Sequence, residues 1–475
     1  MSGLINGVYE HSPLWLQQLG VAAYGLYRRH RRFGSEFERL TSEYEERETW
    51  DADRMTAYVD SQLREQLLRA FHDVPFYRSR FLEQGISDDQ LRRFRSDQMA
   101  TLPMLEKARV RESPRALLAK DARRRALSTY LTSGTTGAPI RVMWDAATHR
   151  HNMAVREARS LRWAGVSYRD SRAVIGGRMI VPRAEGRPPF WRWNPAENQL
   201  YLSAFHISRS NAPAYAAALT ARRPTVLTGY ASSVFSLARF FSELGLTVPP
   251  PRAVITESEK LEPEMRAVIE AALGAPTFEE YGSVENCALA TECECHRLHV
   301  HQDFGYVEIV GPDGTPTQPG EVGEIVVTGF ANPHQVFVRY RIGDLAAWSA
   351  EACPCGRSTL PVLHQLVGRV EDMIIGPDGR EVVRFHGLFV GLSGVVEGQV
   401  VQETPLRYTV NVSPSAQYSE RDRATIESRL RQRVGSGVTV EVRLVPEIPR
   451  DRSGKFRAVI SKVKRLDADV KDGAR

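Results

Sequence analysis

Short β-rich runs alternate with amphipathic helical runs from about residue 128 onward, and this order restricts the fold of the chain more than any other feature. Helical and β-rich runs follow one another at 213–219, 225–228, 232–244, 253–256, 262–273 and 276–278. Such alternation is typical of an α/β fold, in which helices cover the faces of a sheet. We therefore expect an α/β protein with a large body that contains several sheets.

A helical segment precedes the α/β region. Apolar side chains recur at helical spacing between Met55 and Phe71. Pro75 ends this run, because a proline inside a helix has no N–H to donate. Residues 1–100 are expected to form a helical lead to the N-terminal body.

A small C-terminal domain is predicted by a second change of pattern. The sequence indicates a β-hairpin at 373–383, a helix at 420–433 and a strand at 438–444. We therefore expect an N-terminal body at 1–367 and a small C-terminal α/β domain at 368–475.

The composition is that of an ordinary globular enzyme. The chain has 475 residues, of which 42% are hydrophobic and 25% charged, with a formal net charge of +6. A mild positive charge suits anionic ligands such as nucleotides. No basic run is interleaved with aromatic residues, as a nucleic-acid groove requires, so we expect no nucleic-acid partner.

The N-terminal apolar stretch at 14–27 does not have the pattern of a targeting signal. It is shorter than the roughly 20 residues that span a bilayer. Its basic cluster at 28–32 follows the apolar part, the reverse of a secretory signal peptide. A surface helix in a cytoplasmic protein is the main interpretation, and peripheral membrane contact through an amphipathic helix is the alternative.

All five cysteines lie between Cys287 and Cys355, and four of them form two Cys-x-Cys pairs. In a large chain without a secretory signal this clustering favours a metal site or free thiols over disulfides. Sulfur and imidazole ligands suit a tetrahedral, structural Zn²⁺. The ligand set predicted is Cys293, His299, Cys353 and Cys355. The alternatives are a set in which Cys295 or another histidine replaces one of these ligands, and reduced, unbound cysteines.

A glycine- and hydroxyl-rich run at 130–139 has the composition of a phosphate-binding loop. Its glycines allow tight bending, and its N–H and O–H groups are donors for anionic oxygens. It is not a Walker-type loop, because no Gly-Lys-Ser/Thr closes it. An ordinary surface loop has a similar composition. The candidate phosphate ligands are Ser133, Gly134, Thr135, Thr136 and Gly137.

Further motifs follow this loop in a fixed order. They are Glu280-Tyr281-Gly282-Ser283-Val284-Glu285, the segment from Arg339 to Asp344, Gly368-Arg369-Val370-Glu371, and the segment from Arg450 to Lys455. Their order and spacing resemble the adenylate-forming acyl ligase superfamily, and within it the branch of phenylacetate–CoA ligases and capsular-polysaccharide (CapK-like) proteins. The resemblance covers nearly the whole chain. It implies a large body of the adenylate-forming type and a small C-terminal domain that rotates about a hinge at Glu371.

The resemblance also implies roles for single residues. Activation of a carboxylate by ATP brings two anions together, so it requires cationic and N–H donors and a metal ion. Tyr281 would stack on adenine and Asp344 would accept the ribose hydroxyls. Glu285 would ligate Mg²⁺, and the catalytic Lys455 would reach the carboxylate and the α-phosphate. The ATP-binding set is completed by Glu280, Gly282, Ser283 and Arg369.

Each of these motifs also has a simpler interpretation. Tyr281 and Gly282 fit a strand-end turn, Asp344 a turn cap, and Lys455 a solvated lysine. The chain departs from the family pattern at Ile140, which stands where a lysine often follows the loop. It departs again at Glu371, where the family usually has aspartate or lysine as the hinge.

The resemblance implies an ATP-dependent ligase that joins a small carboxylic acid to coenzyme A through an acyl-adenylate. The alternatives are adenylation followed by transfer to a carrier-protein thiol or an amine, and a non-catalytic nucleotide-binding scaffold. The sequence specifies neither the acid nor a choice between monomer and homodimer. By position relative to the motifs, the acyl pocket is expected at Phe205, His206, Gly229 and Tyr230, although aromatic residues there also fit core packing.

Overall fold

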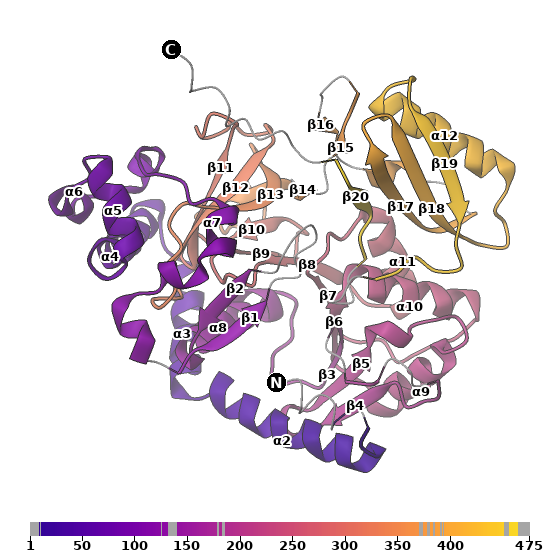
Figure 1. Cartoon of the computed structure of the whole chain (residues 1–475). Coiled ribbons are helices and arrows are strands. Elements are labelled where there is room, and N and C mark those ends of the chain that lie inside the picture. The colour runs from indigo at the N-terminus through magenta and orange to yellow at the C-terminus, as the bar shows by residue number, and fades with distance from the viewer. Residues whose placement is uncertain are drawn as a thin grey trace. The chain divides into compact units, whose positions relative to one another are not determined.

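The structure is a computed structural model of the whole chain (Figure 1). It describes residues 9, 11–124, 126–131, 140–177, 180–182, 186–369, 374–377, 381–382, 385–389, 392, 394–450 and 456–463. The chain divides into two compact units, Met1–Leu366 and Val367–Arg475.

The first unit begins with helices (Figure 1). They are α2 (Leu14–Arg32), α3 (Ser35–Arg47), α4 (Ala52–Asp73), α5 (Pro75–Glu83), α6 (Asp88–Arg92) and α7 (Lys107–Glu112). The side chain of Asp51 caps α4 by accepting a hydrogen bond from the Arg54 N–H at 2.8 Å. Pro75 then begins α5, where a missing N–H costs nothing. The predicted helix and its end before Pro75 are therefore confirmed.

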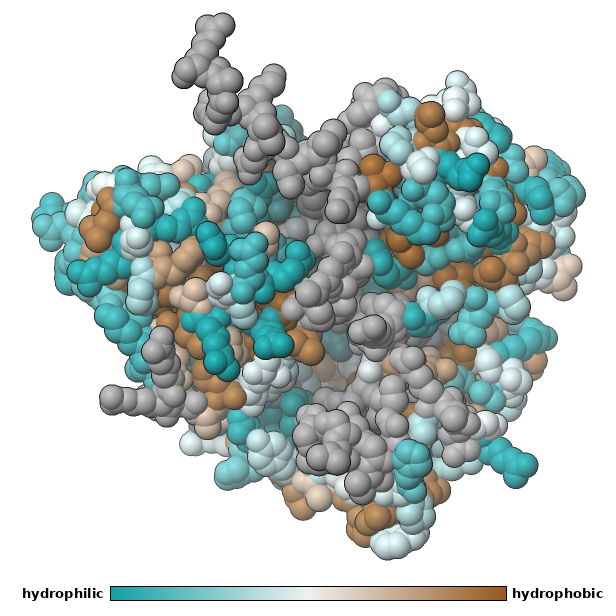
Figure 2. All heavy atoms as spheres, in the orientation of Figure 1, coloured by the Kyte–Doolittle hydropathy of each residue, from teal (hydrophilic) through white to brown (hydrophobic). Residues whose placement is uncertain are grey.

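Helix α2 exposes an apolar stripe. Trp15, Leu19 and Leu26 are each about half exposed or more, and they lie on one face at helical spacing. The helix ends in a basic turn at Arg29–Arg32. Figure 2 shows hydrophobic patches along the lower edge of the molecule, where Figure 1 draws α2. No helix within the described part of the chain is both long and apolar enough to cross a membrane.

The first unit is built on one twelve-stranded sheet and a separate hairpin of β1 (Ser128–Leu131) and β2 (Arg141–Trp144). In the sheet the strands are ordered β11-β12-β13-β14-β10-β9-β8-β7-β6-β3-β5-β4. Their bounds are β3 (Arg172–Gly176), β4 (Trp191–Asn194), β5 (Gln199–Ser203), β6 (Val226–Tyr230), β7 (Ala253–Glu257), β8 (Thr277–Gly282), β9 (Leu289–Glu292), β10 (Leu298–Val300), β11 (Gly305–Val310), β12 (Gly323–Gly329), β13 (Tyr340–Trp348) and β14 (Val362–Arg369).

The five strands β5, β3, β6, β7 and β8 are parallel to one another, and β4 and β9 flank them in antiparallel orientation. Parallel strands require crossover connections, which the helices between them supply. The predicted alternation of helices and strands, and with it the α/β fold, is confirmed.

Helices cover both faces of this parallel region (Figure 1). On one face, α9 (Ala212–Arg222), α10 (Ala231–Glu243) and α11 (Pro263–Leu273) enclose a core that includes Leu227 and Val254. On the other face lie α8 (Ala146–Val155) and a π-helical segment, Arg156–Leu161, that continues it. Single π-helical turns are rare in proteins, and many of those that occur lie at functional sites.

The second unit has its own core. Strands β17 (Val395–Thr404), β18 (Arg407–Pro414), β19 (Thr439–Leu444) and β20 (Val459–Ser461) form a sheet in the order β19-β18-β17-β20. Helix α12 (Glu420–Val434) packs on it through Ile426 and Leu430. A short hairpin of β15 (Ile374–Ile375) and β16 (Glu381–Val382) precedes this sheet, as predicted.

Candidate active site

A cavity of about 580 Å³ lies in the first unit, between the parallel strands and the helices α2 and α8. On the sheet side, Val174, Tyr201, Thr228 and Ile255 line it. Val174 pairs with both Tyr201 and Thr228, and Thr228 pairs with Ile255, so these four side chains share one face of the sheet. It is the face opposite the α9–α11 core.

The cavity reaches the carboxyl ends of three parallel strands. Tyr230 ends β6, Glu257 ends β7, and Glu280 lies near the end of β8. Ligands of open α/β sheets bind outside these strand ends. The strand order therefore makes this cavity the leading candidate for a substrate site.

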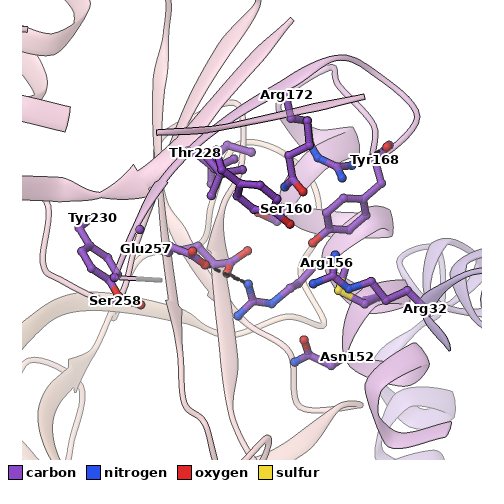
Figure 3. A pocket seen from close by; sticks show the side chains of 18 of the residues that line it. Arg32, Asn152, Arg156, Ser160, Tyr168, Arg172, Thr228, Tyr230, Glu257 and Ser258 are labelled. Carbon is purple, nitrogen blue, oxygen red and sulfur yellow. Dashed lines mark hydrogen bonds and ion pairs between the residues drawn. The ribbon is translucent and has the colours of Figure 1, made fainter. Parts of the chain in front are cut away.

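Arg156 lies at the centre of the cavity lining (Figure 3). Its Nη1 lies 2.7 Å from Oε1 of Glu280 and 3.1 Å from Oε2 of Glu257. Burial raises the pKa of Glu280 from its ordinary value, and the Arg156 guanidinium opposes that rise. The single guanidinium of Arg156 thus pairs with the carboxylates of both Glu257 and Glu280. Figure 3 also shows the Tyr168 ring beside Arg156.

A second charged group lines the cavity near the end of α2. Arg32 Nη1 lies 2.8 Å from Oε2 of Glu197, and Arg172 Nη2 lies 3.4 Å from the same oxygen. The Arg172 side chain is only 2% exposed and that of Glu197 only 1%. Burial, and then the positive charge of Arg32, lowers the pKa of the neighbouring His149 to about 2. This end of the cavity is therefore strongly positive.

Three of the predicted nucleotide-binding residues meet at the carboxyl end of β8. The Tyr281 hydroxyl donates a hydrogen bond to Oδ2 of Asp344 at 2.8 Å. The Tyr340 hydroxyl donates to Oε1 of Glu285 at 3.0 Å. Burial raises the pKa of Glu285, and hydrogen bonds from the backbone and from Tyr340, followed by the charge of Lys107, oppose the rise. The structure brings together Tyr281, Glu285 and Asp344, which the sequence places up to 63 residues apart.

Three other residues were predicted for nucleotide binding. Gly282 lies beside Arg156, since a Cβ there would be in ordinary contact with Arg156 Nη2 at 3.4 Å. Ser283 has a buried hydroxyl with no hydrogen-bond partner among the described residues. Arg369 is the last residue of β14, and its side chain lies outside the described part of the chain.

Only one of the four residues predicted for the acyl pocket lines the cavity among the described residues. Tyr230 lines the cavity, whereas the other three are not among its described lining residues. His206 is buried, with Nδ1 2.8 Å from the Ser203 hydroxyl, and its ring stacks on Phe190. A Cβ on Gly229 would lie 2.5 Å from the Ile175 carbonyl oxygen, so glycine allows two strands to approach there. Phe205 is half-buried next to His206.

Several predicted residues lie outside the described residues. They are Ser133, Gly134, Thr135, Thr136 and Gly137 of the phosphate loop, the hinge residue Glu371 and the catalytic Lys455. Along the chain, the loop connects β1 to β2, which pair as an antiparallel hairpin. Tyr130 and Leu131, the last residues of β1, line the cavity. The roles of these residues stay predictions.

The four predicted metal ligands cluster. Ligand atoms of Cys293, His299, Cys353 and Cys355 all lie within 4.8 Å of one another. The sulfurs of Cys293 and Cys353 are 3.6 Å apart, and Nε2 of His299 lies 3.4 Å from the sulfur of Cys355. Tetrahedral zinc with bonds of about 2.0–2.3 Å would separate its ligand atoms by about 3.5–3.7 Å.

The orientation of His299 also fits a metal site. Its Nδ1 lies 2.9 Å from the Leu360 carbonyl oxygen, so the N–H is at Nδ1 and the lone pair of Nε2 faces the thiols. Cys295 is exposed and is not part of the cluster. The donor set therefore fits Zn²⁺.

Charged contacts connect the metal-ligand loops to the π-helical segment. Arg357 contacts Glu294 at 2.7 Å and Glu48 at 3.2 Å. Glu48 lies 3.5 Å from Nε of the fully buried Arg159, which pairs with Asp303 at 2.6 Å. The π-helical segment thus carries Arg159 in this network and Arg156 in the cavity.

Of the charged cavity residues, the sequence interpretation included Glu280 but missed Glu257 and the three arginines, and it also missed Lys107. Lys107 Nζ donates to the Ile342 carbonyl at 3.3 Å, one residue before the glycine that precedes Asp344. Glu257 was within reach of prediction, because it follows a predicted strand, and the ends of parallel strands share one edge. Arg32, Arg156 and Arg172 gave no such signal, since only tertiary packing brings them to one cavity.

The sequence is similar to those of known proteins. Residues 374–462 match the family described as CapK C-terminal domain. The chain is 25% identical to protein CapK of Staphylococcus aureus, over 97% of this chain and 100% of that one. It is 26% identical to a phenylacetate-coenzyme A ligase of Thermus thermophilus, over 87% and 98%.

The fold has solved counterparts. A structure of 2-hydroxyisobutyryl-CoA ligase in the postadenylation state superposes with a TM-score of 0.69 at 21% identity, covering 87% of this chain and 90% of that one. By sequence the chain is a relative of CapK and of the phenylacetate–coenzyme A ligases, and its fold is that of the adenylate-forming acyl ligases.

Proposed function

We propose that the protein is an ATP-dependent carboxylic acid ligase, which forms an acyl-adenylate with release of pyrophosphate and then transfers the acyl group to coenzyme A. One observation carries the proposal. Tyr281, Glu285 and Asp344 meet at the end of β8, directly beside a cavity that reaches the ends of the parallel strands. Relatives along nearly the whole chain include phenylacetate–coenzyme A ligases.

The geometry of the three residues suits binding of ATP. Asp344 is fixed by the Tyr281 hydroxyl and can accept hydrogen bonds from ribose hydroxyls, while the Tyr281 ring offers a face for adenine. Glu285 is a buried carboxylate fixed by Tyr340, and its oxygens are the hard ligands that Mg²⁺ prefers. The loop from Ser133 to Gly137 and Lys455 supply the donors for the phosphates in this proposal.

The proposal includes two structural parts. A zinc ion bound by Cys293, His299, Cys353 and Cys355 would tie two loops together and take no part in the reaction, because a site with four protein ligands has no open position. The C-terminal domain would rotate about a hinge at Glu371 between the half-reactions. We place the enzyme in the cytoplasm, where ATP and coenzyme A are available.

Coenzyme A is the acceptor that the named ligase relatives favour. A carrier-protein thiol or an amine is the second candidate acceptor.

A panel of carboxylic acids in an ATP–pyrophosphate exchange assay tests the adenylation step. Exchange that depends on an added acid supports the proposal, and its absence with a broad panel contradicts it. Mass spectrometry of the products formed with coenzyme A, with a phosphopantetheine thiol or with an amine then identifies the acceptor.

A further inference from the structure

The charges of the cavity lining are unevenly distributed. Around Arg156, one guanidinium faces the two carboxylates of Glu257 and Glu280. Near α2, the two guanidiniums of Arg32 and Arg172 share the single carboxylate of Glu197. The cavity therefore has a surplus negative charge toward β7 and β8 and a surplus positive charge toward the end of α2.

The positive end also contains donors that lack acceptors. Within the described residues, Nε of Arg32 and Nε of Arg172 are buried without a hydrogen-bond partner. Arg172 is almost completely buried, and Arg32 is 11% exposed. Leaving a charged donor buried without a partner is costly. Both Nε atoms are shielded from the cavity, so a ligand would meet the two guanidiniums through the parts of Arg32 and Arg172 that line it.

The positive end is separated from the nucleotide motifs by the length of the strands. Arg172 begins β3 and is paired with Gln199, the first residue of β5, whereas Tyr281, which hydrogen-bonds to Asp344, lies at the opposite, carboxyl end of β8. Five residues of a parallel strand span about 13 Å, at roughly 3.3 Å per step. A ligand that reaches both ends must therefore be extended.

We propose that the acid activated by this protein carries a second acidic group at the end remote from the reacting carboxylate, and that Arg32 and Arg172 bind this second group. The inference rests on the proposed function, because the cavity is taken to hold the acyl group. It deepens that function by naming a substrate class, extended dicarboxylic acids. The phenylacetate named for the relatives has an uncharged ring at the end remote from its carboxylate.

The test compares matched acids in the exchange assay: octanoate with octanedioate, and decanoate with decanedioate. We expect kcat/KM for the diacid to exceed that for the plain acid by about tenfold or more, the value of one charge-assisted hydrogen bond. A ratio of one or less in the wild-type protein would overturn the inference. Absence of exchange with every acid would instead contradict the proposed function.

Two variants with opposite expected effects distinguish a change in binding of the second acidic group from general damage to the fold. Arg32→Gln should reduce the diacid preference about tenfold, whereas Glu197→Gln should increase it by removing the competing carboxylate. Arg29→Gln is the matched control, because Arg29 is exposed on the same helix and does not line the cavity. A ratio that stays the same in both Arg32→Gln and Glu197→Gln would overturn the assignment.

Discussion

The hydroxyl of Tyr281 and the carboxylate of Asp344 lie 2.8 Å apart, although three strands separate β8 from β13 in the order of the sheet. Neighbouring strands are about 4.8 Å apart, so a flat sheet would separate these strands by about 19 Å. The sheet must therefore curl strongly between β8 and β13. This curl brings together motifs that are distant both in sequence and in strand order.

Replacement of Asp344 by alanine should weaken ATP binding sharply. A charged acceptor for the ribose hydroxyls is worth about 1.5–3 kcal/mol, or roughly a tenfold to hundredfold change in Kd. Tyr281→Phe keeps the ring but removes the hydroxyl that fixes Asp344, so it should have the smaller effect. Isothermal titration with ATP gives both values. Unchanged affinity in a folded Asp344→Ala protein would exclude the ribose role.

Lys107 is expected to position the turn that carries Asp344. Its Nζ donates to the Ile342 carbonyl at 3.3 Å. Lys107→Met should therefore raise KM for ATP severalfold, as expected for one hydrogen bond of about 1 kcal/mol, and should leave the affinity for the acid unchanged. Lys107→Arg should restore much of the loss. Lys120→Met is the control, because Lys120 contacts the distant His72 carbonyl. Equal KM values in the Lys107→Met and control variants would contradict this role.

The proposed zinc site predicts metal content and stability together. Protein purified without chelators should contain close to one zinc per chain by elemental analysis. Cys353→Ser should lower both the zinc content and Tm, since it removes a ligand from the cluster. Cys295→Ser should have the smaller effect on both, because Cys295 is exposed and lies outside the cluster, although its side chain contacts Cys353. Zinc-free wild-type protein would eliminate the site.

Lys455 should matter for only one half-reaction. The family resemblance assigns it to adenylation, where its charge offsets the repulsion between the carboxylate and the α-phosphate. Lys455→Ala should slow adenylate formation about 10²–10³-fold, as for the loss of one electrostatic stabiliser. Given a presynthesised acyl-adenylate, the same variant should transfer the acyl group at a near wild-type rate. Equal losses in the two assays would argue against a rotating C-terminal domain.

Glu279 should make the stability of the protein depend on pH. Burial raises its pKa from an ordinary 4.5 to about 7. The fold therefore favours the protonated form, whose stabilising contribution is complete below about pH 4.5 and is lost as pH rises through about 7. Glu279→Gln removes this dependence. The Tm of the variant minus the Tm of the wild type should therefore increase between about pH 5 and pH 8. A constant difference in Tm would show that Glu279 is ionised throughout this range.

The sequence was most informative where local rules act. Pro75 marks a helix boundary, and the alternating runs after residue 128 specify a parallel α/β region; both depend on neighbouring residues alone. The clustering of Cys293, His299, Cys353 and Cys355 was also predictable, because the choice of donor atoms follows from the chemistry of zinc.

The charged cavity was not predictable, for a physical reason. Arg156 lies on a π-helical turn, and no periodicity of apolar residues marks such a turn. Arg32 comes from a helix that the sequence suggested only as a surface element. His206 was taken for a pocket residue, but its hydrogen bond to Ser203 and its stacking on Phe190 are core packing, which an aromatic-rich sequence cannot distinguish from a ligand site.

The contacts of Glu48 have a consequence for the evolution of the chain. Glu48 joins Arg357, next to a metal-ligand loop, to the buried Arg159 of the π-helical segment. Loss of the cysteines would release the loop that carries Arg357 and so remove one of the two positive charges that neutralise Glu48. Related sequences that lack the four side chains should therefore also lack the acid at position 48. An alignment of homologues should show these positions changing together, as a single inherited unit.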